Sequence, residues 1–298
     1  MYDVIIVGAG PAGLTAAVYC LRNKKSVLVL EKEAIGGKIA SSPRIDNFPT
    51  YKSITGSEFA QKLADQVKEL GCLIKFEEVC SIKDSKVITS DNTYEAKAII
   101  IASGTHYRTL NLEREDEFLG NGISFCTVCD APFYQDEDVL VVGGANSAMI
   151  SAITLAGFCN KVYLAVRKDE LRGERDLIEE VSNLSNVEIL YNTVIEEYLG
   201  DDEIEGVIVN QDGDRLNISV SGVFPAIGQD ADVNFLDNSV DKDKDNYIIS
   251  RDDMSTNIPG IFVAGDVRKK SVRQLTTAVS DGTIAALSAL EYIKKIDA

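Results

Sequence analysis

DVIIVGAGPAGL (residues 3–14) and DVLVVGGANSAM (residues 138–149) align without a gap. Each copy has an apolar run short enough for a buried parallel strand, then a Gly-rich turn, then a segment with helical periodicity. A second apolar run follows each copy, SVLVLE (26–31) in the first and KVYLAV (161–166) in the second. The chain therefore contains two βαβ units, which predict an α/β fold made of two doubly wound, Rossmann-like dinucleotide-binding domains.

The first copy has every part of a dinucleotide-binding fingerprint, including an acidic residue at the end of its second strand. Gly8 permits the tight turn, Gly10 lets the backbone approach a pyrophosphate at the helix N-terminus, and Gly13 allows close helix packing. Glu31 can accept hydrogen bonds from ribose hydroxyls. This pattern predicts a bound dinucleotide and leaves both NAD and FAD open.

The distant segment PGIFVAGDV (259–267) favours FAD. It has the pattern of an apolar strand ending at Asp266, and a helix-like stretch follows from Gln274 to Tyr292. It resembles the flavoprotein motif whose aspartate hydrogen-bonds the ribityl chain of FAD. We therefore expect a discontinuous FAD-binding domain, residues 1–110 and 240–298, with a second domain inserted at residues 111–239.

Two cysteines stand three positions apart in SFCTVCD (124–130), within the expected second domain. This spacing brings the sulfurs of Cys126 and Cys129 within disulfide reach. A structural zinc would need two more ligands, and the sequence has neither a second CxxC nor a histidine pair, so no metal site is expected. Because His106, the only histidine, lies outside the motif, Asp130 is the candidate proton donor. Its alternative role is a residue of a turn or helix start.

Composition restricts the classes of function. With 298 residues, 45% of them hydrophobic, the chain can bury the cores of two domains. The net charge of −17 disfavours nucleic acid and membrane surfaces as partners. No secretory signal and no membrane span are expected, so the predicted location is the cytoplasm. Four further cysteines are expected to be small buried hydrophobes, namely Cys20, Cys72, Cys80 and Cys159.

The chain resembles the low-molecular-weight thioredoxin reductase family over almost its whole length. Seven motifs in order carry the resemblance: GAGPAG, IGGKIASSPRIDNFP, IIIASGT, CTVCD, GVFPAIG, AGDV and RQLTTAVSDG. It implies FAD as cofactor, thioredoxin as substrate protein, a homodimer, and a swing of the two domains that presents the dithiol to thioredoxin. It also implies that electrons pass from the flavin to Cys126 and Cys129, and that Asp130 handles the protons. The residues implied to bind FAD are Gly8, Gly10, Pro11, Ala12, Gly13, Glu31, Gly37, Lys38, Asn47, Gly104, Asp266, Arg273, Gln274 and Leu275.

The second βαβ unit departs from the family at its expected NADPH site. Ala145 adds a methyl group where a pyrophosphate needs a bare backbone. The family sequence HRRxxxR is replaced by VRKDELR (166–172), in which Val166 replaces the histidine and Lys168 replaces an arginine. Lysine offers a ribose 2′-phosphate a point charge in place of a planar, bidentate guanidinium group. In these departures the chain resembles the ferredoxin-dependent flavin thioredoxin reductases, which lack intact pyridine-nucleotide motifs.

Reduced ferredoxin is accordingly the expected electron donor, and NADPH is the alternative. Because ferredoxins are acidic, the cluster of Arg268, Lys269, Lys270 and Arg273 beside Asp266 is expected to form a basic docking surface. The alternative for this cluster is an ordinary solvated loop. A flavoprotein that senses redox state without turnover is a third reading, and the complete CTVCD motif argues against it.

Overall fold

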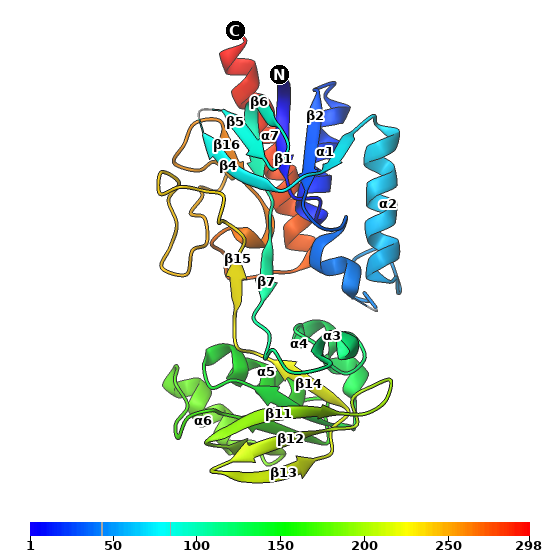
Figure 1. The fold of residues 1–298 in the computed structure, drawn as a ribbon, viewed down its shortest axis with the longest axis vertical. Coiled ribbons are helices and arrows are strands. Elements are labelled where there is room, and N and C mark those ends of the chain that lie inside the picture. The colour runs from blue at the N-terminus through cyan, green and yellow to red at the C-terminus, as the bar shows by residue number, and fades with distance from the viewer. Residues whose placement is uncertain (43, 84) are drawn as a thin grey trace. The chain divides into compact units, whose positions relative to one another are not determined.

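The chain folds into two compact units in a computed structural model that describes residues 1–42, 44–83 and 85–298 (Figure 1). Pro43, in the second of the seven motifs, and Asp84 lie outside the described residues. The first unit comprises Met1–His106 and Asp230–Ala298, and the second comprises Tyr107–Gln229. The predicted α/β class with two nucleotide-binding folds, one inserted in the other, is confirmed.

The two divisions between the units fall earlier in the chain than the expected 110/111 and 239/240. The larger difference concerns residues 230–239. Val233, Phe235 and Leu236 are buried in a hydrophobic core of the first unit, together with residues of its sheet. Apolar burial of this segment therefore assigns it to the first unit.

A mostly parallel sheet forms the centre of the first unit. Its parallel strands follow the order β3-β2-β1-β6-β16, and β5 and β4 extend the sheet from β6 in antiparallel fashion. The strands are β1 (Tyr2–Val7), β2 (Val27–Glu31), β3 (Leu73–Phe76), β4 (Val79–Lys83), β5 (Lys86–Thr89), β6 (Thr93–Ile101) and β16 (Ile261–Val263).

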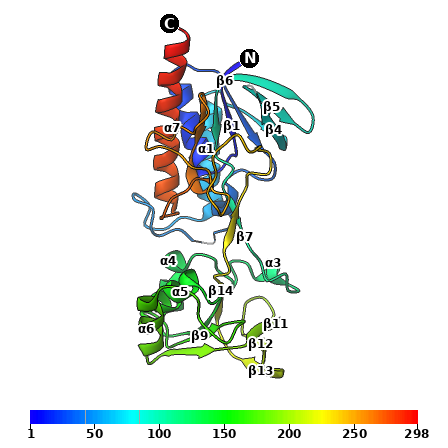
Figure 2. The same ribbon diagram turned by 90° about the vertical axis from the view of Figure 1, so that its left-hand side faces the viewer.

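Both faces of β1 are covered, which explains its uninterrupted apolar sequence. Val4 and Ile6 belong to the core that contains helices α1 (Pro11–Arg22) and α7 (Leu275–Ile296), which lie on one side of the sheet in Figure 2. Ile5 and Val7 belong to the core on the opposite face, since successive side chains of a strand point to opposite sides. Helix α2 (Gly56–Glu69) packs beside α1.

The C-terminal segment of the first unit differs slightly from expectation. Strand β16 ends at Val263, because Gly265 adopts a left-handed conformation with φ +79° that a regular strand does not allow. Asp266 therefore lies in the 3₁₀ helix η3 (Gly265–Val267) and not at the end of a strand. The predicted helix is confirmed as α7, whose N-cap Gln274 forms a capping box with Thr277.

The second unit repeats the design on a smaller scale. Its parallel sheet has the order β10-β9-β8-β14 and packs against α5 (Asn146–Ala156) and α6 (Arg175–Asn183). An antiparallel sheet, β11-β12-β13, packs against the other face. The strands are β8 (Asp138–Val142), β9 (Lys161–Ala165), β10 (Val187–Leu190), β11 (Thr193–Leu199), β12 (Gly206–Gln211), β13 (Asp214–Ile218) and β14 (Gly222–Pro225).

The remaining elements are short. The two segments that connect the units, β7 (Thr105–Tyr107) and β15 (Gln229–Ala231), pair with each other. In the part of the chain that the structure describes, no helix combines the length and the apolar character that a membrane span requires. The short helices are η1 (Gly37–Ser41), α3 (Glu115–Phe118), α4 (Thr127–Asp130) and η2 (Ala131–Tyr134).

Candidate active site

The first Gly-rich turn leaves a free space at the N-terminus of α1. Gly8 has φ +105°, and a Cβ atom there would overlap the carbonyl oxygen of Ala102. A Cβ atom at Gly13 would overlap the carbonyl oxygen of Gly8, so helix and strand approach as closely as the fingerprint predicts. At Gly10, the N-cap of α1, a Cβ atom would meet no protein atom within 4 Å. This space at the N-terminus of the helix fits a pyrophosphate.

Glu31 lies beside this turn at the end of β2. Its Oε2 accepts a hydrogen bond from the backbone N–H of Ala9 at 2.7 Å, and its Oε1 accepts one from the N–H of Glu33 at 2.9 Å. These bonds fix the carboxylate, and each oxygen keeps a lone pair for a further donor. The position suits the ribose contact that the sequence predicts for Glu31.

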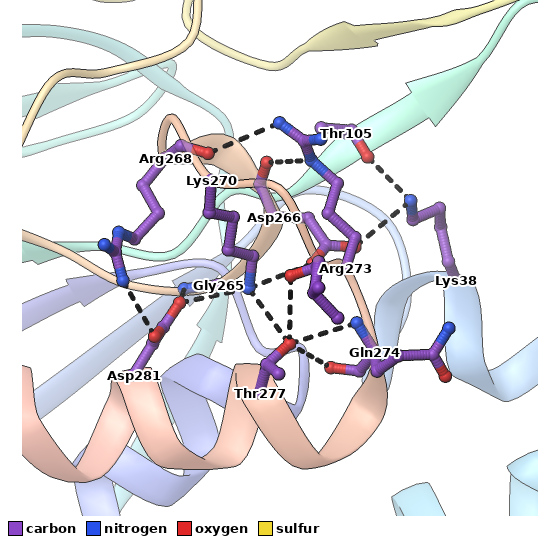
Figure 3. Close-up of polar contacts among 11 residues, drawn as sticks. Lys38, Thr105, Gly265, Asp266, Arg268, Lys270, Arg273, Gln274, Thr277 and Asp281 are labelled. Carbon is purple, nitrogen blue, oxygen red and sulfur yellow. Dashed lines mark hydrogen bonds and ion pairs between the residues drawn. The ribbon is translucent and has the colours of Figure 1, made fainter. Parts of the chain in front are cut away.

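Asp266 is surrounded by cationic side chains (Figure 3). Lys38 Nζ lies 3.4 Å from its Oδ2, and Lys270 Nζ lies 3.5 Å from its Oδ1. Arg273 Nε donates a hydrogen bond to the main-chain carbonyl oxygen of Asp266 at 3.2 Å. Within the described residues, Oδ1 is buried and accepts no hydrogen bond. An acceptor of this kind fits a hydroxyl donor such as those of a ribityl chain.

Lys38 joins this cluster to the segment that follows β6. Its Nζ donates to Thr105 Oγ1 at 2.6 Å in addition to its ion pair with Asp266. Burial lowers the pKa of Lys38, while the neighbouring Asp266 carboxylate acts in the opposite direction. Gly104, the residue before Thr105, has φ +74°, where glycine carries little strain.

The other residues predicted to bind FAD lie in the same unit. A Cβ atom at Gly37 would lie 3.7 Å from the Cα of Gly10. A Cβ atom at Gly265 would lie 2.9 Å from the Cβ of Ala12, and one at Gly282 would overlap the carbonyl oxygen of Ala12. Asn47 Nδ2 donates to Gln274 Oε1 at 3.4 Å. Pro11 and Leu275 are the first residues of α1 and α7. The structure thus brings together chain segments from both parts of the first unit, as a single cofactor site requires.

The structure contradicts the idea that four exposed cations follow Asp266. Arg268 Nη1 and Lys270 Nζ each lie 3.0 Å from the carboxylate of Asp281, a buried residue of α7 (Figure 3). Arg273 stacks on the Tyr247 ring, with its guanidinium carbon 4.0 Å from the ring centroid. Lys269 is the member of this cluster that is exposed. The pairing of Asp281 with Arg268 and Lys270 has no signal in the sequence, since it depends on how α7 packs against this loop.

Cys126 and Cys129 form a disulfide in the second unit, with their Cα atoms 5.3 Å apart. Cys126 is the N-cap of the single-turn helix α4, and its carbonyl oxygen accepts hydrogen bonds from the N–H groups of Cys129 and Asp130, both at 3.0 Å. Between the cysteines, Val128 is 65% exposed. This turn therefore supports the pair and leaves part of it open to solvent.

The carboxyl group of Asp130 lies in a partly buried position next to this turn. Ser124 Oγ donates to its Oδ2 at 2.6 Å, and within the described residues the buried Oδ1 has no hydrogen-bond partner. Burial raises the pKa of Asp130, and the Ser124 hydrogen bond acts in the opposite direction. A carboxyl group of this kind holds a proton more readily than an exposed aspartate. Sequence analysis did not identify Ser124, since an isolated serine has no distinctive pattern.

The remaining cysteines are only partly as expected. Cys20 and Cys159 are buried, Cys72 is half-buried, and Cys80 is exposed, so the expectation of burial is wrong for Cys80. Burial raises the pKa of Cys159 to about 11 and that of Cys72 to about 11. These two thiols are therefore poor nucleophiles at neutral pH.

The Gly-rich turn of the second unit is more crowded than the first. Ala145 is the N-cap of α5 and has an extended backbone, as Gly10 has before α1. The methyl group of Ala145 therefore enters the space in the second unit that corresponds to the free space beside Gly10 in the first unit. Val166 is buried, and a Cβ atom at Gly144 would lie 2.8 Å from it. A pyrophosphate fits this turn less well than it fits the first.

Comparison with known proteins defines the family. The chain matches the model of the pyridine nucleotide-disulphide oxidoreductases over residues 2–282. It is 40% identical to a Clostridium pasteurianum protein described as a 34.2 kDa protein in rubredoxin operon, over 98% of this chain and 97% of the relative. It is 35% identical to the thioredoxin reductase of Listeria monocytogenes, over 99% and 95% of the two chains.

A solved structure also places the chain among the thioredoxin reductases. The crystal structure of thioredoxin reductase from Streptococcus pyogenes superposes with a TM-score of 0.96 at 37% identity, and the match covers 99% of each chain. The family of this enzyme consists of FAD-binding flavoproteins, which agrees with the cofactor predicted from the fingerprint and Asp266. The chain therefore belongs to the low-molecular-weight thioredoxin reductase family of pyridine nucleotide-disulphide oxidoreductases.

Proposed function

We propose that this protein reduces the disulfide of thioredoxin with electrons from reduced ferredoxin. The assignment of thioredoxin reduction rests on the Cys126–Cys129 disulfide next to the partly buried carboxyl group of Asp130. The relatives named thioredoxin reductase, which match nearly the whole chain, support the same assignment.

The first unit would hold the cofactor through two groups of residues. Gly8, Gly10 and Gly13 shape the pyrophosphate site at α1, with Glu31 at the ribose. Asp266 offers its unsatisfied Oδ1 to a ribityl hydroxyl, and Lys38 and Lys270 hold that carboxylate in place. Bound FAD supplies the electron transfer between the donor and the disulfide.

The cysteine pair carries out thiol–disulfide exchange. Two electrons and two protons convert the Cys126–Cys129 disulfide into two thiols. One of them, as thiolate, attacks the thioredoxin disulfide and forms a mixed disulfide between the two proteins. The other cysteine then attacks the sulfur of the first cysteine in that mixed disulfide, which restores the Cys126–Cys129 disulfide and releases thioredoxin as a dithiol. Asp130 donates and accepts a proton at this pair, a role that suits a carboxyl group whose pKa burial raises.

The proposal for the donor rests on the second nucleotide-binding unit. The Ala145 methyl group narrows the pyrophosphate position, and buried Val166 offers no polar contact where the family has histidine. Lys168 is exposed and followed by Asp169, whose negative charge opposes its attraction for a 2′-phosphate. Glu170 pairs with Arg172 at 3.4 Å, which engages a further cation of this segment. These features support a donor other than NADPH, which remains the second candidate.

The docking surface for an acidic donor needs revision, because Arg268 and Lys270 are largely buried in ion pairs with Asp281. Lys269 remains exposed in this segment and lies on a pocket of ≈ 520 Å³ that Lys270 and Arg273 also line. Asp243 and Asp245 line the same pocket and oppose an acidic partner, so the attraction rests on the cationic side of the pocket. We assign the contact with ferredoxin to Lys269. Charge reversal in Lys269→Glu should slow flavin reduction by ferredoxin and weaken its dependence on salt, whereas photochemical reduction should not change.

Reduction of thioredoxin can be tested without any natural donor. The flavin of the purified holoenzyme is reduced photochemically under anaerobic conditions, oxidised thioredoxin is added, and the new thioredoxin thiols are counted. The proposal predicts up to two thioredoxin dithiols for each fully reduced enzyme, because the reduced flavin and the reduced Cys126–Cys129 pair together hold four electrons. A flavin that stays reduced while thioredoxin stays oxidised would support the redox-sensing alternative.

A further inference from the structure

We infer that Ser124 is a positioning residue that holds Asp130 for proton transfer at the Cys126–Cys129 pair. This inference rests on the function proposed above. Ser124 does not exchange electrons or protons with the substrate itself. Its hydroxyl group connects the backbone of one cysteine to the carboxyl group that serves both.

The Ser124 hydroxyl makes two hydrogen bonds at once. Its Oγ donates to Asp130 Oδ2 at 2.6 Å and accepts from the backbone N–H of Cys126 at 3.1 Å. One hydroxyl can do both because it has one O–H donor and two lone pairs. The position of the Asp130 carboxyl group is thereby tied to the first residue of the disulfide.

Ser124 is itself firmly placed. The residue is only 6% exposed, and its backbone N–H donates a hydrogen bond to the carbonyl oxygen of Val223 in β14 at 3.0 Å. The preceding residue, Ile123, belongs to the hydrophobic core that contains Val223. The central sheet of the unit therefore fixes the hydroxyl group, whereas α4 alone is a single turn.

The two carboxyl oxygens of Asp130 have different environments. Ser124 occupies Oδ2, and within the described residues Oδ1 is buried without a hydrogen-bond partner. A buried polar atom without a partner is rare and calls for a functional reason. We assign to Oδ1 the proton that passes to and from the cysteine pair.

In the disulfide form, the pKa of Asp130 is set by burial, which raises it, and by the Ser124 hydrogen bond, which lowers it. Cys126 and Cys129, once reduced, are titratable neighbours on α4. Tyr134, on η2, has a pKa raised to about 12 by burial and by Asp130, Cys159 and Glu203, so it is a neutral phenol at physiological pH. Loss of the Ser124 hydrogen bond should move the pKa of Asp130 upward, because that bond stabilises the carboxylate.

The test compares Ser124→Ala, Ser124→Thr and Asp130→Asn in a Cys80→Ser background, which removes an exposed thiol outside the site. Each holoenzyme is reduced with dithiothreitol, freed of it, and mixed with 5,5′-dithiobis(2-nitrobenzoate) from pH 5 to 9. We expect Ser124→Ala to slow the fast thiol phase by roughly tenfold at pH 7, part of the ~10²-fold or more that a general acid or base contributes. Its pH profile should move upward, and Ser124→Thr should restore both rate and profile.

Two outcomes would overturn the inference. One is an Ser124→Ala profile that coincides with that of the wild type, and the other is a shift that persists when Asp130 is also replaced by asparagine. If Ser124→Ala does not fold, Ser124→Val provides the same comparison, since it has the shape of Ser124→Thr without a hydroxyl group and adds no thiol. The synthetic disulfide does not require thioredoxin, so failure of the proposed function alone would leave this result interpretable.

Discussion

Ala145 occupies in the second nucleotide-binding unit the position that Gly10 occupies in the first. Each residue is the N-cap of the helix that follows the first strand, and both backbones are extended, with φ −74° and ψ 178° at Gly10 and φ −114° and ψ −179° at Ala145. Equivalent backbones place a side chain in equivalent directions. The methyl group of Ala145 is therefore the clearest difference between the Gly-rich turns of the two units.

Gly10→Val should yield a folded protein that has lost most of its FAD. A Cβ atom at Gly10 meets no protein atom within 4 Å, so a side chain there enters the pyrophosphate space without a clash at its first atom. The flavin absorbance per protein and the circular dichroism spectrum measure the two effects. Gly13→Val is the contrasting variant, because its side chain overlaps Gly8 and should destabilise the fold itself. A full complement of FAD in Gly10→Val would refute this placement of the cofactor.

Cys126→Ser and Cys129→Ser should each abolish thioredoxin reduction and leave photochemical reduction of the flavin intact. Exchange needs one sulfur to form the mixed disulfide and the other to resolve it. Cys80→Ser is the matched control, since Cys80 is exposed in the other unit, and it should keep normal turnover. Normal turnover in either variant of the pair would exclude this disulfide from the mechanism.

Asp130→Asn should change the pH dependence of stability. Burial raises the pKa of Asp130 in the folded state, so the folded protein binds a proton more tightly than the unfolded chain. Stability from this group is therefore lost as the pH rises from the ordinary aspartate pKa through the raised folded value. Urea unfolding between pH 4 and pH 8 should show a smaller decline in the free energy of unfolding for Asp130→Asn. Parallel curves for variant and wild type would contradict this account.

Asp281→Asn should destabilise the protein by roughly 3 kcal/mol, because it leaves the partly buried Arg268 without a carboxylate and Lys270 with that of Asp266 alone. Urea unfolding of the holoenzyme measures this change. Glu291→Gln, which breaks the exposed ion pair with Lys295 on the same helix, is the control and should have no measurable effect. Equal stabilities of the two variants would indicate that Asp281 is solvated in solution.

The sequence predicted those parts of the site whose chemistry is local. Gly8, Gly10 and Gly13 follow from the geometry of one turn, and the Cys126–Cys129 spacing lies within a few residues. Ser124 and Asp281 could not be predicted, since their roles depend on where a hydroxyl group and a carboxylate end up after folding. The same reason explains the error about Arg268 and Lys270, which look exposed in sequence and are ion-paired with Asp281 in the structure.

The central claim is that electrons reach thioredoxin from ferredoxin through the flavin and the Cys126–Cys129 pair. Anaerobic stopped-flow mixing of the oxidised holoenzyme with NADPH or with reduced ferredoxin, followed through the flavin absorbance, tests it most directly. We expect ferredoxin to bleach the flavin within the time of turnover and to sustain thioredoxin reduction, and millimolar NADPH to bleach it slowly or not at all. Rapid bleaching by NADPH, with no reaction from ferredoxin, would contradict the claim and identify an NADPH-dependent enzyme.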